Sequence, residues 1–221
     1  MTRQNTDKTP PKGAVRFSIS LSAEQKEAKT AILAHPYNFI VGPAGSGKTL
    51  LAVQVALDMF FKKQINKIII TRPTISTEDN GFLPGSEKEK MEPWLVPIRS
   101  NMRKIYNKPE KLEKMENDES IELVSLAHFR GRTFDNAVVI VDEFQNLSRS
   151  QLAMAIGRLG KESKMIFCGD SYQIDLKDKN WSAYHDMAKL TNSEYVYKTV
   201  LEDSHRHGAI ANLLELLNGY H

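Results

Sequence analysis

The sequence lacks the features that mark secreted, membrane-spanning and cysteine-based zinc proteins. It holds one cysteine, Cys168, among 221 residues, which excludes an internal disulfide framework and a zinc site built on cysteines. No apolar run approaches the roughly 18 residues that a membrane-spanning helix needs, and the polar first residues lack the apolar stretch of a signal peptide. We therefore expect a cytoplasmic protein, in the host cytoplasm if it is viral, with no membrane partner.

Most of the chain also carries no net charge. The net charge is +3, and residues 1–16 carry all of it, with four basic side chains against Asp7. The remaining residues balance 26 basic against 26 acidic side chains. A nucleic acid would therefore have to bind a local patch or the first residues. We predict a flexible basic arm over 1–17, for which a solvated leader is the alternative to a binding role, followed by one domain over 18–221.

Short Val- and Ile-rich blocks alternate with helical segments along the chain. The blocks are expected to be strands at 37–41, 67–71, 121–124, 137–142, 164–168 and 194–199. Helices are expected from Leu21 onward and near 48–61, 87–104, 149–158, 182–190 and 207–218. Short apolar blocks are typical of parallel strands that are covered on both faces. The alternation predicts an α/β fold with a mostly parallel sheet and helices on both faces.

A glycine-rich motif follows the first predicted strand. Its residues match the pattern G-x-x-x-x-G-K-[ST]: Gly42, Pro43, Ala44, Gly45, Ser46, Gly47, Lys48 and Thr49. Glycines let backbone N–H groups wrap a phosphate closely, and the N-terminus of the next helix adds positive potential. Lys48 is expected to bridge the β- and γ-phosphates, and Thr49 to bind Mg²⁺. The motif predicts a nucleotide site over Gly42–Leu50.

Two adjacent carboxylates end the apolar strand predicted at 137–142. Asp142 is expected to hold the Mg²⁺ shell, usually through a water. Glu143 is expected to orient and polarise the attacking water as a general base. A solvated acidic turn is the alternative. The Asp-Glu pair favours ATPases of the RecA and helicase type over nucleotide kinases, and the absence of an Asn-Lys-x-Asp motif favours ATP over GTP.

Taken together, these motifs resemble the PhoH family of ATPases. The resemblance runs from about residue 20 to the C-terminus and lies in the phosphate loop, Arg72-Pro73, Gly81–Gly85, Arg130–Thr133, Asp142–Asn146, Gly169–Asp175 and Arg206-His207. It implies a RecA-like P-loop NTPase domain over 18–221, related to superfamily 1 helicases. Phe144 departs from the family pattern, in which a small alanine is usual, and we expect this to alter packing. Ser204-His205 stands where an apolar pair is more usual.

The resemblance implies roles for several further side chains. Gln25 would read the adenine edge, although a capping box with Ser22 is the alternative. Gln173 would sense the γ-phosphate. Gln145 would couple the nucleotide state to a bound nucleic acid, and a solvent-facing helix start is its alternative.

Helicases of this class complete the ATP site with an arginine from a second RecA-like domain. The chain is too short for such a domain, so a neighbouring subunit is expected to supply the arginine within a homo-oligomer, such as a hexameric ring. Arg206 is the first candidate, and Arg130 and Arg132 are the next. A surface salt bridge is the alternative for each.

Two functions from different classes stay open. In the first, ATP hydrolysis drives a helicase-like motor on RNA or single-stranded DNA. Arg72, Thr74, Arg130 and Arg132 would then contact the nucleic-acid backbone, and Phe129 or Trp94 could stack a base. In the second, the protein is a nucleotide-switched assembly or partner-binding module without a nucleic-acid substrate.

Overall fold

A computed structural model describes residues 17–73 and 87–203, together with Ala209, Leu213 and Leu216; over 87–94 it describes the backbone alone. Several predictions fall outside these residues. They are the arm over 1–16, Thr74, the motif Gly81–Gly85, the side chain of Trp94, Arg206 and most of the helix predicted over 207–218.

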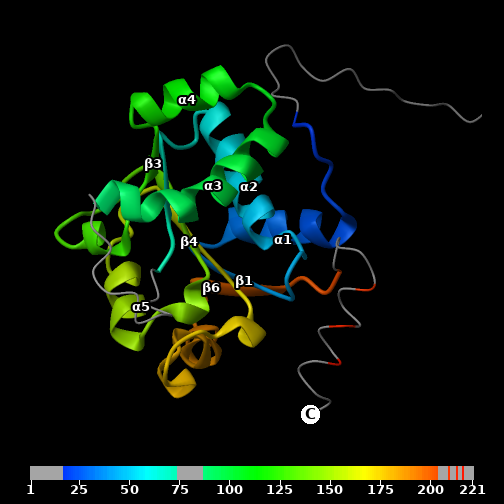
Figure 1. The fold of residues 1–221 in the computed structure, drawn as a ribbon, viewed down its shortest axis with the longest axis vertical. Helices are drawn as coiled ribbons and strands as arrows, with labels where there is room; N and C mark the ends of the chain where they lie inside the picture. Colours follow the sequence, from blue (N-terminus) through cyan, green and yellow to red (C-terminus); the bar gives the residue numbers. More distant parts are fainter. Residues whose placement is uncertain (1–16, 74–86, 204–208, 210–212, 214–215, 217–221) are drawn as a thin grey trace, which may run out of the picture.

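A single sheet of six parallel strands forms the centre of the molecule (Figure 1). The strand order is β3-β2-β4-β5-β1-β6. The strands are β1 (Tyr37–Val41), β2 (Lys67–Thr71), β3 (Ile121–Leu123), β4 (Ala137–Asp142), β5 (Lys164–Gly169) and β6 (Val196–Val200). All six predicted strands are present, with β6 shifted toward the C-terminus by one to two residues, and the predicted α/β fold is confirmed.

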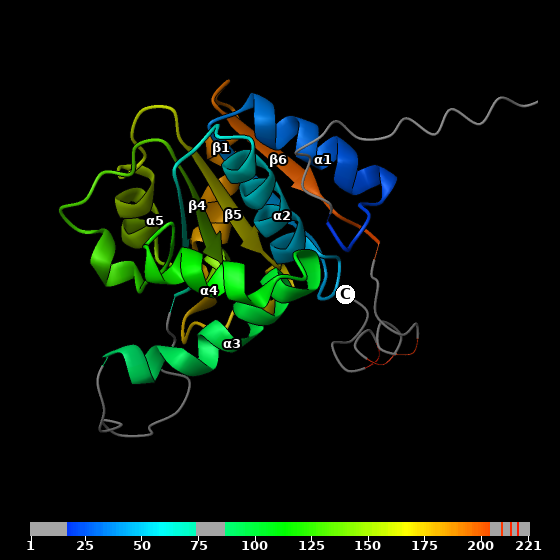
Figure 2. The ribbon, with the colours of Figure 1, turned by 90° about the horizontal axis from the view of Figure 1, so that it is seen from above.

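Helices cover both faces of this sheet, as Figure 2 shows. One layer contains α1 (Ala23–Ala34), α2 (Lys48–Phe61), α3 (Glu87–Ile105) and α4 (Pro109–Asn117), and the other contains α5 (Arg149–Ile156) and α6 (Met187–Leu190). Successive strand residues point to opposite faces. Ile68 and Ile70 therefore join the core under the first layer, while Ile69 joins the core under α5. Two buried faces explain why the central strands β2, β4, β5 and β1 have no polar face, whereas the edge strand β6 is largely exposed.

The helices differ from the prediction in three places. α4 was not predicted, although Pro109 at its first turn and the buried Leu112 and Met115 give it a start signal and an apolar face. The helix predicted at 182–190 is a 3-10 turn (Ala183–Asp186) followed by the single turn of α6. α5 ends at Ile156, two residues earlier than expected, with Gly157 as its C-cap.

The strand order gathers the sequence motifs at one edge of the sheet. In a parallel sheet the carboxyl ends of all strands lie at the same edge. β1 leads into the phosphate loop, and β4 ends at Asp142, with β5 between them. Segments that are about 100 residues apart in the sequence therefore meet at a single site. Within the described residues, no helix is both long and apolar enough to cross a membrane.

Candidate nucleotide-binding site

The glycines of the phosphate loop have conformations and contacts that other residues would not tolerate. Gly45 and Gly47 have left-handed backbones, with φ of 86° and 83°, which a Cβ disfavours. A Cβ on Gly42 would collide with the carbonyl oxygen of Leu201, which follows β6. The loop therefore depends on glycine both for its own turns and for its packing against the neighbouring strand.

The polar groups of this loop fit a phosphate ligand. Lys48 Nζ donates to the carbonyl oxygens of Gly42 at 2.7 Å and Pro43 at 2.9 Å, which holds the ammonium against the loop. Ser46 Oγ is buried and has no hydrogen-bond partner among the described residues. Gly47 caps α2 without a side-chain hydrogen bond, so backbone N–H groups at this helix start can bind an anion. A nucleotide's phosphate oxygens match these donors.

A direct hydrogen bond joins the phosphate loop to β4. Thr49 Oγ1 donates to Asp142 Oδ1 at 2.6 Å, and Asp142 is 6% exposed. Burial, and then the charge of Glu143, raises the pKa of Asp142 to about 6. The two oxygens fit the oxygen ligands that Mg²⁺ prefers. No cluster of three or more His, Cys, Asp or Glu side chains suited to a metal occurs in the described part of the chain, so the ion would also need phosphate and water oxygens.

Glu143 leaves the end of β4 in an unusual backbone conformation. Its φ of 55° and ψ of 41° are left-handed, a conformation that costs a non-glycine residue about 1 kcal/mol or more. Its Oε2 accepts a hydrogen bond from Gln145 Nε2 at 2.6 Å. Its Oε1 lies 3.6 Å from a guanidinium nitrogen of Arg72. The turn places the carboxylate beside the Thr49–Asp142 contact, where it has two polar partners.

Gln145 lies within a buried hydrogen-bond network, so the alternative of a solvent-facing helix start is wrong, while its coupling role stays a prediction. The side chain has no exposed surface, so it neither faces solvent nor touches a nucleic acid directly. Its amide donates to the carbonyl oxygen of Gln173 at 3.0 Å and accepts from the N–H of Asp170 at 3.2 Å. Gln145 therefore joins Glu143 to the loop after β5. Sequence reasoning missed Asp170, although it lies in the quoted segment Gly169–Asp175.

Gln173 and Gln25 contact different parts of the chain. Gln173 Nε2 donates to Asp170 Oδ2 at 2.9 Å, which places Gln173 at the carboxyl end of β5. Gln25 forms the predicted capping box with Ser22 at the start of α1, and that alternative is confirmed. Gln25 is also buried, and its Nε2 donates to the carbonyl oxygen of Ser46 at 3.2 Å. The capping residue therefore also contacts the phosphate loop.

Phe144 belongs to the core below the site. It is fully buried and its ring contacts Phe39, Phe167 and Tyr184. A Cβ on Gly169 would lie 2.5 Å from the Phe144 ring. Phe144 therefore fills the space between β4, β5 and the segment after Ser182.

The residues predicted to contact nucleic acid are not equally available. Phe129 is fully buried, so the prediction that it stacks a base is wrong. Arg132 is paired with Glu122 at 2.8 Å and lies over the Phe134 ring, and about a third of its side chain is exposed. Arg130 is exposed. Arg72 is half-buried at the end of β2, beside Glu143.

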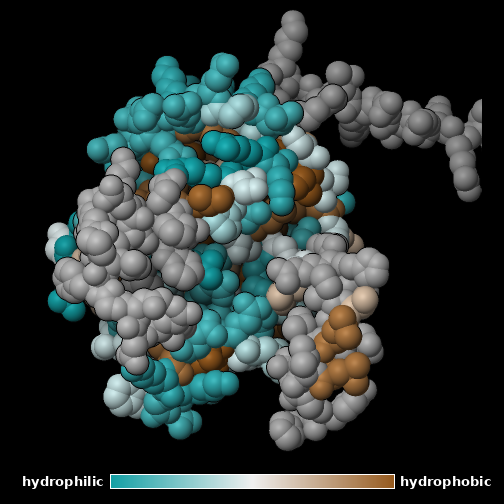
Figure 3. Space-filling view, in the orientation of Figure 1, coloured by the Kyte–Doolittle hydropathy of each residue, from teal (hydrophilic) through white to brown (hydrophobic). Residues whose placement is uncertain are grey.

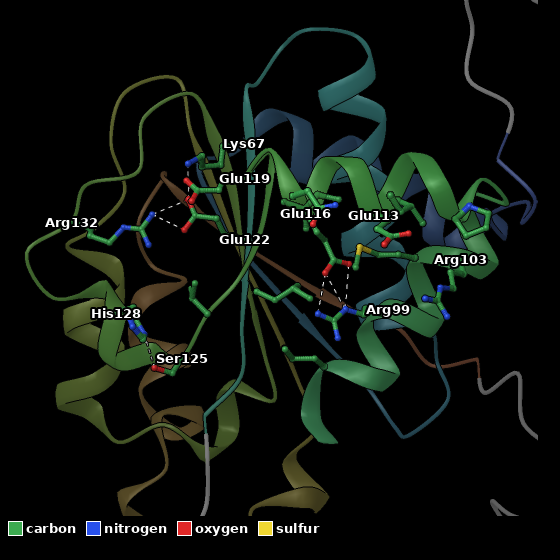
Figure 4. A pocket seen from close by; sticks show the side chains of 18 residues that line it. Lys67, Arg99, Arg103, Glu113, Glu116, Glu119, Glu122, Ser125, His128 and Arg132 are labelled. Atoms are coloured by element: carbon green, nitrogen blue, oxygen red, sulfur yellow. Dashed lines mark hydrogen bonds and ion pairs between the residues drawn. The ribbon is translucent and has the colours of Figure 1, made fainter. Parts of the chain in front are cut away.

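A separate cavity of about 1120 Å³ lies at the open edge of β3 (Figure 4). Its walls come from β3, α3, α4 and the 3-10 helix Leu126–Phe129. Basic and acidic side chains line it as ion pairs. Lys67 and Arg132 pair with Glu122, and Arg99 pairs with Glu116. No residue of the phosphate loop, and neither Asp142 nor Glu143, lines this cavity, so it is distinct from the nucleotide site.

The fold and the site together define a RecA-like P-loop NTPase. Solved structures with this fold include the Pif1 helicase from Candida albicans, with a TM-score of 0.51, 18% identity, and 90% of this chain and 44% of that chain covered. They also include the Sulfolobus solfataricus SWI2/SNF2 ATPase core in complex with dsDNA, with a TM-score of 0.52, 14% identity, and coverage of 90% and 47%. At these identities the likeness concerns the fold alone.

The chain belongs to the PhoH family. The family model described as PhoH-like protein matches residues 19–218. A PhoH-like protein of Mycobacterium leprae is 36% identical over 200 residues, which are 89% of this chain and 57% of the relative. A PhoH-like protein of Bacillus subtilis is 37% identical over 195 residues, 86% of this chain and 61% of the relative. The chain thus spans about half to three fifths of these relatives' length.

Proposed function

We propose that the protein binds ATP with Mg²⁺ and hydrolyses it. The observation that carries this proposal is the 2.6 Å hydrogen bond between Thr49 and Asp142, with Glu143 directly beside it. This contact joins the phosphate-binding loop to a magnesium-type carboxylate, and the candidate general base is the next residue in the chain. An acidic turn that faced only solvent would have no reason to be buried against the loop's threonine.

Each part of the site has a distinct task in this reaction. The backbone of Gly42–Leu50 wraps the phosphates, and Lys48 neutralises charge on the β- and γ-phosphates. Thr49 and Asp142 would hold Mg²⁺, which would supply further positive charge. Glu143 orients the attacking water and accepts its proton. Gln173 senses the γ-phosphate, and Gln25 reads the adenine.

We further propose that the active form is a homo-oligomeric, cytoplasmic motor on RNA or single-stranded DNA. The neighbouring subunit would supply an arginine, with Arg206 first and the exposed Arg130 next. Arg132 is a weaker candidate because Glu122 already pairs with it. The helicase-like fold supports a motor, and the chain spans only part of its relatives' length.

A nucleotide-switched module without a nucleic-acid substrate is the second candidate. The equal number of acidic and basic residues after residue 16 favours it. The described surface on the face seen in Figure 3 is mostly hydrophilic, with hydrophobic side chains in small separate areas, and it does not distinguish the two candidates. Salt-dependent stimulation of ATP turnover by single-stranded RNA would favour the motor. An intact oligomer whose turnover no RNA or DNA changes would favour the switch.

Two substitutions test the hydrolysis itself. Lys48→Ala is expected to weaken ATP binding, measured by fluorescence titration with a labelled analogue. Glu143→Gln is expected to keep ATP binding but to lower turnover by about 10²–10⁴, the usual contribution of a general base. Exposed Lys62→Ala, in an ion pair with Asp58 on α2, is the control for loss of a lysine. Unchanged binding and turnover in both site variants would refute the proposal.

A further inference from the structure

Arg72 and Glu143 meet where two neighbouring parallel strands end. β2 and β4 are paired with Thr71 level with Val141, so the residues after the two strands leave the sheet close together. A guanidinium nitrogen of Arg72 lies 3.6 Å from Glu143 Oε1, and about a quarter of each side chain is exposed. The ion pair therefore places a cation from the end of β2 against the carboxylate that we assign as the general base.

The two oxygens of this carboxylate are held in different ways. Oε2 accepts a short hydrogen bond from Gln145, which is fully buried and also bonded to Gln173 and Asp170. Oε1 faces Arg72 at a distance that is long for a hydrogen bond. The first contact is internal and fixed. The second lies at the surface, where a ligand from solvent can replace it.

A phosphodiester is the ligand chemistry best suited to take Arg72 from Glu143. A guanidinium can bind a phosphate through two parallel hydrogen bonds, whereas the nitrogen–oxygen distance from Arg72 to Glu143 is 3.6 Å. A partly exposed ion pair is also weak, so a backbone phosphate can displace it. The nucleotide's own phosphates are accounted for by the loop residues and Lys48.

We propose that Arg72 is a positioning residue that occupies Glu143 Oε1 until a phosphate of a single-stranded RNA or DNA backbone binds the guanidinium. The inference rests on the proposed ATP hydrolysis. Once Arg72 turns to the phosphate, Oε1 can accept the water's hydrogen bond, while Gln145 keeps the carboxylate in place. The water oxygen then bonds to the γ-phosphorus, the bond from that phosphorus to the bridging oxygen of ADP breaks, and the water proton passes to Glu143.

Arg72→Gln tests this arrangement because glutamine removes the charge but keeps a polar side chain. Without nucleic acid, the variant's kcat is expected to rise about two- to fivefold, the range set by the strength of a partly exposed ion pair, with the KM for ATP unchanged. Stimulation by poly(U) or oligo(dT) is expected to be lost. The variant's binding to a fluorescent poly(U) oligonucleotide should also weaken, with the salt slope reduced by about 1.

Two matched variants separate this role from a general loss of an arginine. Arg99→Gln breaks an Arg–Glu pair of nearly the same exposure in the cavity beside β3, and it should leave the basal turnover and its stimulation unchanged. The double variant Arg72→Gln/Glu143→Gln should lose the added turnover, because the gain acts through Glu143. Thermal melting of each variant shows whether the fold is kept.

Several results would overturn the inference. A fall in basal kcat for Arg72→Gln would mean that Arg72 supports the reaction directly. Retained stimulation in that variant would mean that nucleic acid acts elsewhere. A wild-type protein that hydrolyses ATP but responds to neither poly(U) nor oligo(dT) would refute the inference and leave the proposed hydrolysis intact. Absence of any wild-type hydrolysis would instead refute the proposed function.

Discussion

Asp142 favours the stability of the metal-free protein when it is protonated, whereas binding Mg²⁺ requires its ionised form. Its pKa is raised to about 6, first by burial and then by the charge of Glu143. An aspartate in an unfolded chain titrates near 4. The stabilising contribution of this group is therefore complete below about pH 4 and is lost as the pH rises through about 6. At neutral pH the metal-free protein buries a charge that the Thr49 hydrogen bond, Arg72 and Lys48 offset only in part, and a bound cation would neutralise it further.

Asp142→Asn is expected to raise the free energy of unfolding of the metal-free protein by about 2 kcal/mol at pH 8. The neutral amide can still accept the hydrogen bond from Thr49. Urea unfolding in EDTA measures the change, and the gain should shrink toward pH 4.5. Mg²⁺-dependent ATP turnover should fall by about 10² or more because the ion loses its carboxylate. A variant that is no more stable at pH 8 than wild type would contradict the prediction.

At the scale of elements, the start of α1 serves the fold and contacts the phosphate loop. The capping box of Ser22 and Gln25 satisfies N–H groups at the helix start. The same Gln25 side chain reaches the loop at Ser46. Its adenine-reading role stays a prediction. Because Ser22 shares the capping box but not the adenine role, a Ser22 variant can separate the two roles.

Ser22→Ala and Gln25→Ala are each expected to lower the free energy of unfolding by about 1 kcal/mol, the usual effect of losing a cap. Only Gln25→Ala should reduce the preference for ATP over GTP, by about two- to tenfold, the range of one hydrogen bond. Competition titrations with the two nucleotides measure the preference. Equal loss of preference in both variants would assign Gln25 to the cap alone.

The open edge of the sheet at β3 depends on one acidic side chain. Burial alone would raise the pKa of Glu122, but hydrogen bonds from Lys67 and Arg132 bring it below its ordinary value. A lowered pKa gives stability that is present above the ordinary value and is lost as the pH falls through the folded-state value. The pair of cations therefore secures β3 against β2 at neutral pH.

Glu122→Gln is expected to lower the free energy of unfolding by about 1–2 kcal/mol at pH 7, because Lys67 and Arg132 lose a charged partner. The difference from wild type should diminish as the pH falls below about 4. Exposed Glu119→Gln, on the wall of the same cavity, is the matched control and should change stability by less than about 0.5 kcal/mol. Denaturant unfolding at pH 7 and pH 3.5 measures the stability of both variants against wild type.

At the scale of the whole molecule, the described chain forms one RecA-like core around one sheet. In the proposed mechanism, a neighbouring subunit supplies the helicase-type arginine. Mixed oligomers offer a direct test, because an arginine that acts between subunits can be supplied by a partner that lacks its own general base.

Arg206→Gln and Glu143→Gln are each expected to lower turnover by about 10² or more when assayed alone. Their mixture should regain part of the wild-type turnover, since some interfaces combine an intact Arg206 with an intact Glu143. Turnover per subunit should also rise with protein concentration. A stable monomer with full turnover, measured by light scattering beside the ATPase assay, would exclude an arginine from a neighbouring subunit.

The local sequence alone determined the parts of this protein that depend on short-range chemistry. Glycine spacing defines the phosphate loop because only glycine allows its backbone turns, and apolar blocks define the strands because both faces of the sheet are buried. The Ser22–Gln25 capping box was also readable, since all of its groups lie within one helical turn. α4 was missed because its charged surface outweighs an apolar face of two residues.

Only the tertiary structure decided which of these segments meet and which side chains remain accessible. The insertion of β5 between β1 and β4 brings Asp170 and Gln173 to Gln145, and sequence spacing carries no trace of that contact. Burial of Phe129 and Gln145 likewise depends on packing from distant strands and turns. Strand order is fixed by long-range packing, so the network around Glu143, including Arg72, exists only in the folded sheet.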